Sequence, residues 1–452
     1  MSTDLTEEQK PELETAAHTT RPGLVGRARQ TEVWRAVFRH PPLDSPRGRA
    51  LQSFSNVFLH LYPVKVPVRV LRWRYSLRLG FIAIVLFTVL VVTGVYLMFF
   101  YSPTPAAAYS DMVQLKTGVG FGQLVRNVHR WSAHLMVLVV VIHLVRVFYA
   151  GAYKRPRQFN WVLGMALLLV TLGFSFTGYL LPWDQLSYWA VTVGTNMVNY
   201  VPLVGKYIRD ILLGGKQISG ATLQRFYALH VAILPLSLTL ILPVHIWRVR
   251  KDGFAVERGS TGALDPKACP GRKASTAALA TAAQNGDGDG RRVRLLGVVD
   301  RESVAQEEQV TDDTVFAWPH LMVRHVVATL GVCATVLALG VWFQAPLKDI
   351  ANPNLTPEPA KAPWYFEGLQ ELLSRFNPLV AGILLPGAAV MSLLALPYID
   401  RNPATEARNR KVAISLFSMF LGLAVVLTVI GFAFRGPGWQ WQWPWKHSYI
   451  EW

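Results

Sequence analysis

Seven long apolar stretches alternate with polar segments along the chain. They cover residues 79–101, 131–149, 161–181, 226–247, 326–345, 376–398 and 412–434. Each is about as long as a helix must be to cross the hydrocarbon core of a bilayer. With 52% hydrophobic and only 16% charged residues, the composition is also too apolar for an ordinary soluble protein. The pattern predicts an all-α integral membrane protein with seven membrane-spanning helices.

The polar segments divide these helices into two groups. A basic extension with an interfacial segment (1–70) precedes a four-helix domain (71–250). The polar stretch 251–316, rich in glycine and alanine, is typical of a flexible linker. We expect a three-helix domain (317–436) and a Trp-rich tail (437–452) to complete the chain.

The formal net charge of +17 follows a pattern typical of membrane proteins. Residues 21–78 carry twelve Lys and Arg against Glu32 and Asp44, and further basic loops lie at 154–157 and 401–411. Cytoplasmic loops of membrane proteins carry such an excess. We therefore expect a bacterial cytoplasmic membrane protein with its N-terminus and linker in the cytoplasm and its tail outside. We expect no removable signal peptide and no nucleic-acid partner.

Two pairs of histidines lie in the first group of helices. His129 and His143 are 14 residues apart, and His230 and His245 are 15 apart. On regular helices these separations correspond to roughly 21 to 23 Å along the axis and to offsets of about 40° and 60° around it. Two such helices side by side offer four imidazoles in two layers, each able to hold one haem iron from both sides. Such irons keep no open position, so we expect them to carry electrons.

Two pairs of glycines share this spacing. Gly80 and Gly94 are 14 residues apart, as are Gly164 and Gly178. Glycine leaves room for a flat macrocycle to approach a helix backbone, although small residues also serve ordinary helix packing in membranes. The common spacing favours the cofactor role.

For other polar residues near the histidines, the sequence allows more than one role. Arg126, Arg130 and Arg225 could pair with haem propionates or simply extend to the membrane interface. His134, about 140° around the helix from His129, and His325 are expected to pack or to form a hydrogen bond. Only two cysteines occur, Cys269 and Cys333, so we expect neither a disulfide framework nor an iron–sulfur cluster held by this chain.

Three stretches resemble cytochrome b of the quinol-oxidising cytochrome bc and bf complexes, also called Rieske/cytochrome b complexes. They are RNVHRWSAHL (126–135), GYLLPWDQLSYWA (178–190) and RFYALH (225–230). The 15-residue histidine gap resembles the chloroplast-type and Gram-positive branch. From Pro319 onward the chain is similar to the separate smaller subunit of that branch, subunit IV, here fused through the linker. The resemblance covers about residues 60–435.

The resemblance implies two non-covalent b-type haems, an outer one held by His129 and His230 and an inner one held by His143 and His245. It also implies quinol oxidation near the outer haem, quinone reduction near the inner haem, and proton translocation. The implied partners are a Rieske iron–sulfur protein and a cytochrome c or a multihaem cytochrome subunit, within a homodimeric complex in membrane lipid.

Two positions depart from the family pattern. A Pro-Glu-Trp-Tyr signature marks the outer quinol site of the family, whereas this chain has Ala362, Pro363, Trp364 and Tyr365. Without that glutamate, the quinol proton must pass to Asp184, Glu367, or Tyr365 with water, and the sequence does not rank them. Variants lacking the acid tend to accompany menaquinone. Arg78 stands where the chloroplast branch attaches an additional haem to a cysteine, so no covalent c-type haem is expected.

The leading hypothesis is therefore a di-haem cytochrome b subunit of a quinol:cytochrome c oxidoreductase, with menaquinol as the expected substrate. One alternative is a di-haem electron conduit that anchors another respiratory dehydrogenase or reductase. A transporter without a cofactor would require the paired histidines to relay protons. Their register with the glycines disfavours that reading.

Overall fold

The computed structural model describes residues 31, 63–73, 77–253 and 314–445. The chain divides into two units, Met1–Val64 and Lys65–Trp452, and every element named below belongs to the second. Most of the predicted basic extension, most of the linker with Cys269, and the end of the Trp-rich tail lie outside the described residues.

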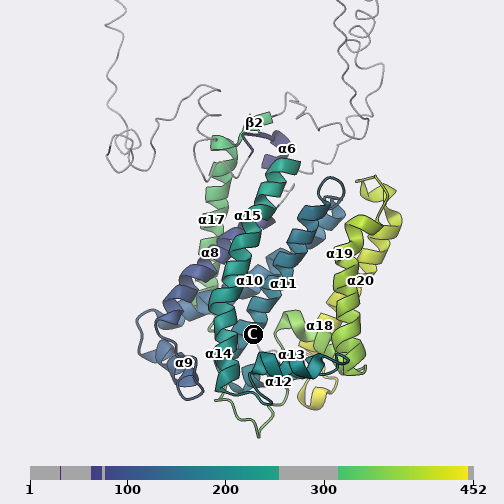
Figure 1. Ribbon diagram of the computed structural model, residues 1–452. Coiled ribbons are helices and arrows are strands. Elements are labelled where there is room, and N and C mark those ends of the chain that lie inside the picture. Colours follow the sequence, from purple (N-terminus) through teal and green to yellow (C-terminus); the bar gives the residue numbers. More distant parts are fainter. Residues whose placement is uncertain (1–30, 32–62, 74–76, 254–313, 446–452) are drawn as a thin grey trace, which may run out of the picture. The chain divides into compact units, whose positions relative to one another are not determined.

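Within the described residues, seven helical segments are long and apolar enough to cross a membrane, which confirms the predicted number of spans and the all-α class (Figure 1). They are α8 (Leu79–Met98), α10 (Gly122–Tyr149), α11 (Gln158–Leu180), the continuous segment Gly220–Asp252, α17 (Ala317–Trp342), the continuous segment Leu379–Ile399, and α20 (Lys411–Phe434). The segment Gly220–Asp252 consists of α14 (Gly220–Ala228), a π-helical turn η2 (Leu229–Ile233) and α15 (Leu234–Asp252). The segment Leu379–Ile399 consists of a π-helical turn η3 (Leu379–Leu384) and α19 (Leu385–Ile399).

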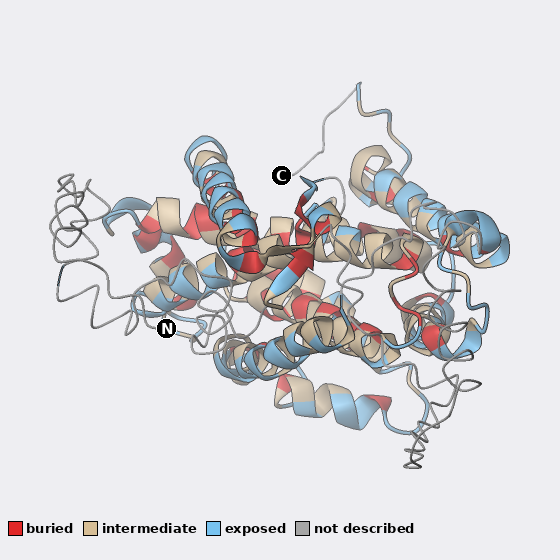
Figure 2. Ribbon diagram, turned by 90° about the horizontal axis from the view of Figure 1, so that it is seen from above, coloured by how far each residue is buried: buried red, intermediate tan, exposed pale blue. Residues whose placement is uncertain are grey.

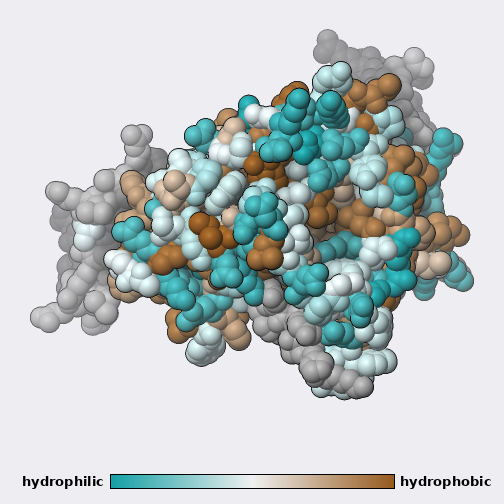
Figure 3. All heavy atoms as spheres, turned by 90° about the horizontal axis from the view of Figure 1, so that it is seen from below, coloured by the Kyte–Doolittle hydropathy of each residue, from teal (hydrophilic) through white to brown (hydrophobic). Residues whose placement is uncertain are grey.

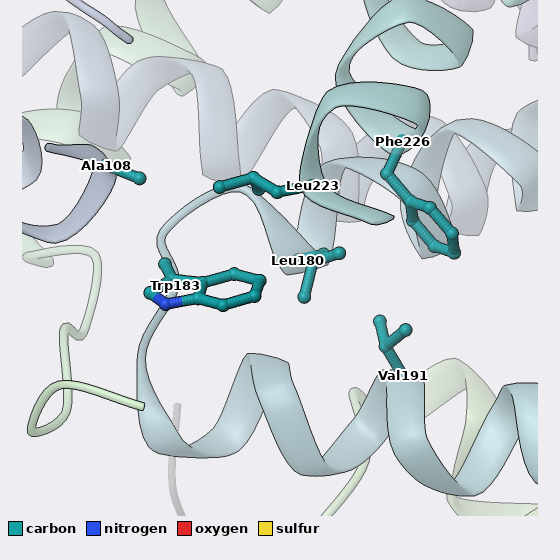
Figure 4. Close-up of a cluster of buried hydrophobic side chains, with 6 residues drawn as sticks. All are labelled: Ala108, Leu180, Trp183, Val191, Leu223 and Phe226. Atoms are coloured by element: carbon teal, nitrogen blue, oxygen red, sulfur yellow. The ribbon is translucent and has the colours of Figure 1, made fainter. Parts of the chain in front are cut away.

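Shorter helices gather at the end of the bundle drawn at the bottom of Figure 1. They are α9 (Ala108–Thr117), α12 (Gln185–Val198), α13 (Gly205–Leu213) and α18 (Trp364–Leu373). A buried apolar cluster joins α9, α11, α12 and α14 there (Figure 4), made of Ala108, Leu180, Trp183, Val191, Leu223 and Phe226. Seen from this end, hydrophilic and hydrophobic side chains are interspersed (Figure 3), as suits a surface at the membrane–water boundary.

Two short strands, one before and one after the four-helix domain in the sequence, pair with each other. β1 (Lys65–Pro67) precedes α6 (Val68–Leu71), and β2 (Thr314–Phe316) precedes α17. The strands are antiparallel, with Lys65 opposite Phe316 and Pro67 opposite Thr314. The last three residues of the predicted linker are thus ordered against the end of the predicted N-terminal extension.

The spanning helices bury one side and expose apolar side chains on the other. α8 and α17 pack on α10, while α11 packs on both α15 and α19, and α18 packs on α20. Figure 2 shows buried residues on the facing sides of the helices and exposed residues on the outer sides. Val341 of α17 and Val412 and Met419 of α20 are among the exposed apolar residues, as expected of helices whose outer sides meet lipid.

Polar residues near the start of α10 bind the chain at the end of α17. The Asn127 side chain donates to Gly340 O and accepts from Ala345 N, each at 2.8 Å. Trp131 Nε1 donates to Phe343 O. The last carbonyls of a helix need partners from outside it, and α10 supplies them here. The apolar window from residue 131 therefore misses the first turns of α10, whose polar groups are satisfied by α17.

The two basic loops that the charge pattern places on one side of the membrane contact each other. Lys154 Nζ lies 3.0 Å from Asp400 Oδ2, and Tyr153 donates a hydrogen bond to the same carboxylate. Arg410, almost fully buried, donates to the carbonyls of Phe148 and Tyr149 at the end of α10. The α10–α11 and α19–α20 connections thus share one end of the bundle.

Candidate functional site

His129 and His230 face each other between α10 and the turn η2. Their ring centroids are 6.4 Å apart and the ring planes meet at 65°. Two imidazoles that bind one metal ion through nitrogens at ~2.0 Å place their ring centres about 6 to 6.5 Å apart. The pair, called here the His129 layer, therefore has the separation that a shared iron requires.

The turn η2 changes the geometry expected for the 15-residue gap. On a regular helix His230 and His245 would be offset by about 60°. In the structure His230 lies within a π-helical turn, which holds one more residue than an α-helical turn. Pro235 follows this turn and has no N–H for the Val231 carbonyl, which explains why the helix widens here. The gap of 15 residues on this span thereby matches the gap of 14 on α10.

Two threonines fix the orientation of the rings in the His129 layer. Thr93 Oγ1 lies 2.8 Å from His129 Nδ1, and it donates to Val89 O at 2.7 Å. Thr177 Oγ1 lies 3.2 Å from His230 Nδ1 and donates to Gly173 O. Since each hydroxyl hydrogen is used on the backbone, the hydroxyl oxygen accepts from Nδ1–H. Each Nε2 is then left with a free lone pair, as a metal ligand needs.

The four predicted glycines each face one histidine ring. A Cβ at Gly94 would lie 3.4 Å from His129 Cε1, and one at Gly178 only 2.5 Å from His230 Cε1. At the other level, Gly80 faces His143 and Gly164 faces His245, at 3.6 and 3.4 Å. We call His143 and His245, the histidines that face these two glycines, the His143 layer. The sequence spacing therefore produces two levels with the same arrangement of histidine and glycine.

These residues fit b-type haems. Each level offers imidazoles from two spans and small residues beside them, and the His129 layer opens on a cavity of about 310 Å³. Ligand sites of proteins commonly have volumes of this order or larger. The cavity extends from His129, His230 and the nearby glycines to a second group of residues from both halves of the chain, which includes Arg130, His134, Asp184 and Tyr365.

Asp184 lies in the wall of the cavity and begins α12. Its Oδ1 accepts from Ser187 N at 2.9 Å, and its Oδ2 accepts from Lys348 N at 3.1 Å. A carboxylate offers about four lone pairs, so each oxygen retains the capacity to accept once more. The side chain thus joins α12 to the segment after α17 and still presents an acceptor to the cavity.

Trp364 and Tyr365 begin α18 and meet α10. Trp364 Nε1 donates to His134 Nδ1 at 3.1 Å, which confirms the expectation that His134 forms a hydrogen bond. The Tyr365 ring lies 5.8 Å from the His134 ring. Burial raises the pKa of the Tyr365 hydroxyl, although Ser175 and Arg130 lower it, so this hydroxyl remains protonated at neutral pH. His325, the other histidine expected to pack, stacks on Phe81, with 3.9 Å between the two ring centroids.

Glu367 is not brought to the cavity. It lies on α18 two residues beyond Tyr365, and a Cβ at Gly431 of α20 would be 3.1 Å from its Oε2. This oxygen has no hydrogen-bond partner among the described residues. Burial raises the pKa of Glu367 to about 8, with Lys361 lowering it and Glu371 raising it. The geometry therefore favours Asp184 and Tyr365 over Glu367 as residues that meet a ligand in the cavity.

The three candidate arginines lie in different surroundings. Arg130 lines the cavity, and its Nε has no partner within the described part of the chain. Arg126 also lines it, but its two terminal nitrogens donate to Ala345 O and Pro346 O. Arg225 is exposed and lies against Gly214. Of the three, Arg130 is best placed to meet an anionic group in the cavity.

Sequence reasoning missed two features of the site. Thr93 and Thr177 were not singled out, although each directly precedes a glycine of the His129 layer. The position of His134 in the cavity wall was also missed, because it depends on contact with α18.

Comparison with known proteins covers both halves of the chain. Residues 64–253 match the family model described as cytochrome b/b6/petB, and residues 350–441 match the one described as cytochrome b (C-terminal)/b6/petD. Cytochrome b6 of Heliomicrobium gestii is 43% identical over 177 residues, which are 39% of this chain and 83% of that protein. Cytochrome b6 of Heliobacterium modesticaldum is 42% identical over 190 residues, 42% of this chain and 88% of that protein.

A solved structure has the same fold. It is described as a hyperthermophilic respiratory Complex III, and it aligns with a TM-score of 0.63 and 24% identity over 79% of this chain and 83% of that one. The two family matches and the cytochrome b6 relatives show that the chain belongs to the cytochrome b family, with a b6-type half fused to a half like subunit IV.

Proposed function

We propose that this chain is the di-haem cytochrome b subunit of a quinol:cytochrome c oxidoreductase. One observation carries the proposal: His129 and His230 stand at the separation of two ligands to one iron, and they share a cavity with Asp184 and Tyr365. A cofactor site and a substrate site within one cavity are what a quinol-oxidising cytochrome b needs.

The ligands would come from two spans at each level. His129 and His230 would hold one b-type haem through Nε2, with Nδ1 of each ring bound by a threonine. His143 and His245 would hold the other. When bound, two such haems supply one-electron carriers at two depths of the membrane.

Quinol would bind in the part of the cavity between α10, α12 and α18. Apolar side chains suit its ring, and the Asp184 carboxylate is the acceptor best placed for a quinol proton. Pro363 occupies the place of the signature glutamate, which favours menaquinol as the substrate. The His143 layer would lie near a quinone-reducing site at the opposite face.

The charge pattern supports an orientation in a bacterial cytoplasmic membrane. The loops that contain Lys154 and Arg410 lie together at one end and would face the cytoplasm, with the His129 layer toward the outer side. The expected partners are a Rieske iron–sulfur protein and a cytochrome c or multihaem cytochrome subunit, in a complex with two copies of this chain.

Haem quantification per polypeptide tests the cofactor assignment. The purified parent should contain two non-covalent haems per chain, and His143→Leu should retain one. His325 lies on a membrane span but belongs to neither layer, so His325→Leu should retain two haems. One haem or none in fully loaded parent protein would overturn the four-ligand assignment.

Because Pro363 replaces the signature glutamate of the quinol site, a second function also fits the chain. It is that of an electron conduit for another respiratory dehydrogenase or reductase. The two differ in what happens when quinol is added to the isolated complex. Quinol-dependent reduction of a cytochrome c through an iron–sulfur protein supports the oxidoreductase. Haem reduction by a different donor, with no such turnover, supports the conduit.

A further inference from the structure

His134 lies in the wall of the cavity, on the same helix as His129 but on another face. It lines the cavity with Arg130, one helical turn earlier, and with Tyr365 of α18. The centroid of its ring lies 5.6 Å from that of Trp131 and 5.8 Å from that of Tyr365. His134 is half-buried and so remains accessible to a molecule in the cavity.

The hydrogen bond from Trp364 fixes the tautomer of this ring. The indole N–H of Trp364 is a donor only, and it points to His134 Nδ1 at 3.1 Å. Nδ1 must therefore carry a lone pair. A neutral imidazole then carries its proton on Nε2, so the nitrogen that is not bound to Trp364 is a hydrogen-bond donor.

We propose that His134 Nε2–H donates a hydrogen bond to one ring oxygen of the bound quinol, with Trp364 holding the donor in place. This inference deepens the proposed function and rests on it. The ligand class is a two-oxygen aromatic ring, since such an oxygen accepts a hydrogen bond both as a hydroxyl and as a carbonyl.

The hydrogen bond from His134 would orient the bound quinol and would stabilise negative charge on the quinol oxygen. A hydrogen bond to an oxygen strengthens as that oxygen becomes more negative, so His134 would favour loss of the quinol proton without receiving it. The proton itself must pass to an acceptor, and Asp184 lines the same cavity with lone pairs available. His134 and Asp184 would thus have complementary roles, one as donor and one as acceptor.

A matched pair of variants tests the donor in the complete, haem-loaded complex. His134→Leu keeps the bulk and removes the donor. His134→Gln keeps both functions, because its Oε1 can accept from Trp364 while its Nε2 donates. The assay is oxidation of a short-chain naphthoquinol with cytochrome c as acceptor, and haem spectra of each variant report on integrity of the fold.

We expect His134→Leu to lower kcat/KM for the quinol at least tenfold and His134→Gln to recover most of it. Trp364→Phe should give an intermediate loss, because the ring is then free to change tautomer. His325 lies on a span but does not line the cavity, so His325→Leu should have the same kcat/KM as the parent.

The outcomes separate this inference from the proposed function. If the parent oxidises quinol and His134→Leu stays within twofold of it, the donor role is overturned while the proposed function stands. If His134→Leu loses activity and His134→Gln does not recover it, with haem spectra intact, the hydrogen bond is not the cause and the inference also fails. A parent that does not oxidise quinol overturns both.

Discussion

A methyl group has no room at Gly178. Its Cβ would lie 2.5 Å from His230 Cε1 and 3.0 Å from Nδ1, so the ring must move. Gly178→Ala should therefore lower the haem content from two to about one per chain. Absorption spectra of the purified protein measure this.

Gly331 of α17 is the matched control, since no atom of the described residues lies within 4 Å of the position of its Cβ. Gly331→Ala should keep both haems, and alanine should stabilise the helix by about 0.5–1 kcal/mol. Two haems in Gly178→Ala would show that His230 does not need its present position.

Glu367 makes stability depend on pH. Because burial raises its pKa from 4.5 to about 8, the folded state favours the protonated form. The stability this contributes is fully present below pH 4.5 and is lost as the pH rises through 8. The parent should lose on the order of 3 kcal/mol of unfolding free energy between pH 6 and 9 through this group.

Glu367→Gln cannot ionise, so it should remove most of that loss in thermal unfolding followed at both pH values. Glu358→Gln changes an exposed glutamate and should keep the pH profile of the parent. An unchanged profile in Glu367→Gln would place the sensitive group elsewhere.

At the residue scale, the sequence predicts the histidines and glycines because their spacing is a property of single helices. Thr93 and Thr177 could not be assigned in the same way. Their hydroxyls already bond within their own helices, as threonine does in any span, and only the neighbouring helix shows that a histidine also uses them. The roles of His134 and Glu367 likewise depend on which side of α18 faces α10.

At the scale of elements, the π-helical turn η2 is the feature that aligns His230. Pro235→Ala restores an N–H for the Val231 carbonyl and so favours a regular helix, in which His230 turns relative to His245. We expect weaker retention of one of the two haems, measured by haem content after dialysis of the purified protein.

Pro386 is the natural control for this variant. It follows the second π-helical turn, η3, at the same position at the start of its helix. Pro386→Ala should change α19 without changing haem content. Equal retention in the two variants and the parent would mean that packing alone maintains η2.

Apolar windows predict all seven spans but not their true ends. The second window begins at residue 131, whereas α10 begins at Gly122, because Arg126 and Asn127 are polar and yet buried. Their partners lie at Gly340, Ala345 and Pro346, more than two hundred residues away along the chain. No local pattern in the sequence contains that information.

At the scale of the whole molecule, the contacts between the halves lead us to expect that the linker is dispensable for assembly. α10 binds the end of α17 through Asn127 and Trp131, and β1 pairs with β2. Two separate chains, produced together by a break within residues 254–313, should assemble and hold two haems. Co-purification through a tag on one chain measures this.

A co-expressed pair carrying Asn127→Leu provides the contrast, because it leaves Gly340 O and Ala345 N without that partner. It should co-purify less well than the unmodified pair. Failure of the unmodified pair to associate would show that covalent connection is required. The division into two halves is readable from the linker composition, but these contacts are not.

The pairing of β1 with β2 sets an order of events during synthesis. Lys65 emerges from the ribosome about 250 residues before Phe316, its partner in the strand pair. At typical rates of translation this interval is roughly 12 to 50 s. The edge of β1 must remain unmatched throughout that time, while four spans enter the bilayer. In the nascent first half, β1 is therefore an unpaired strand. It becomes paired when β2, at the start of the second half, has been synthesised.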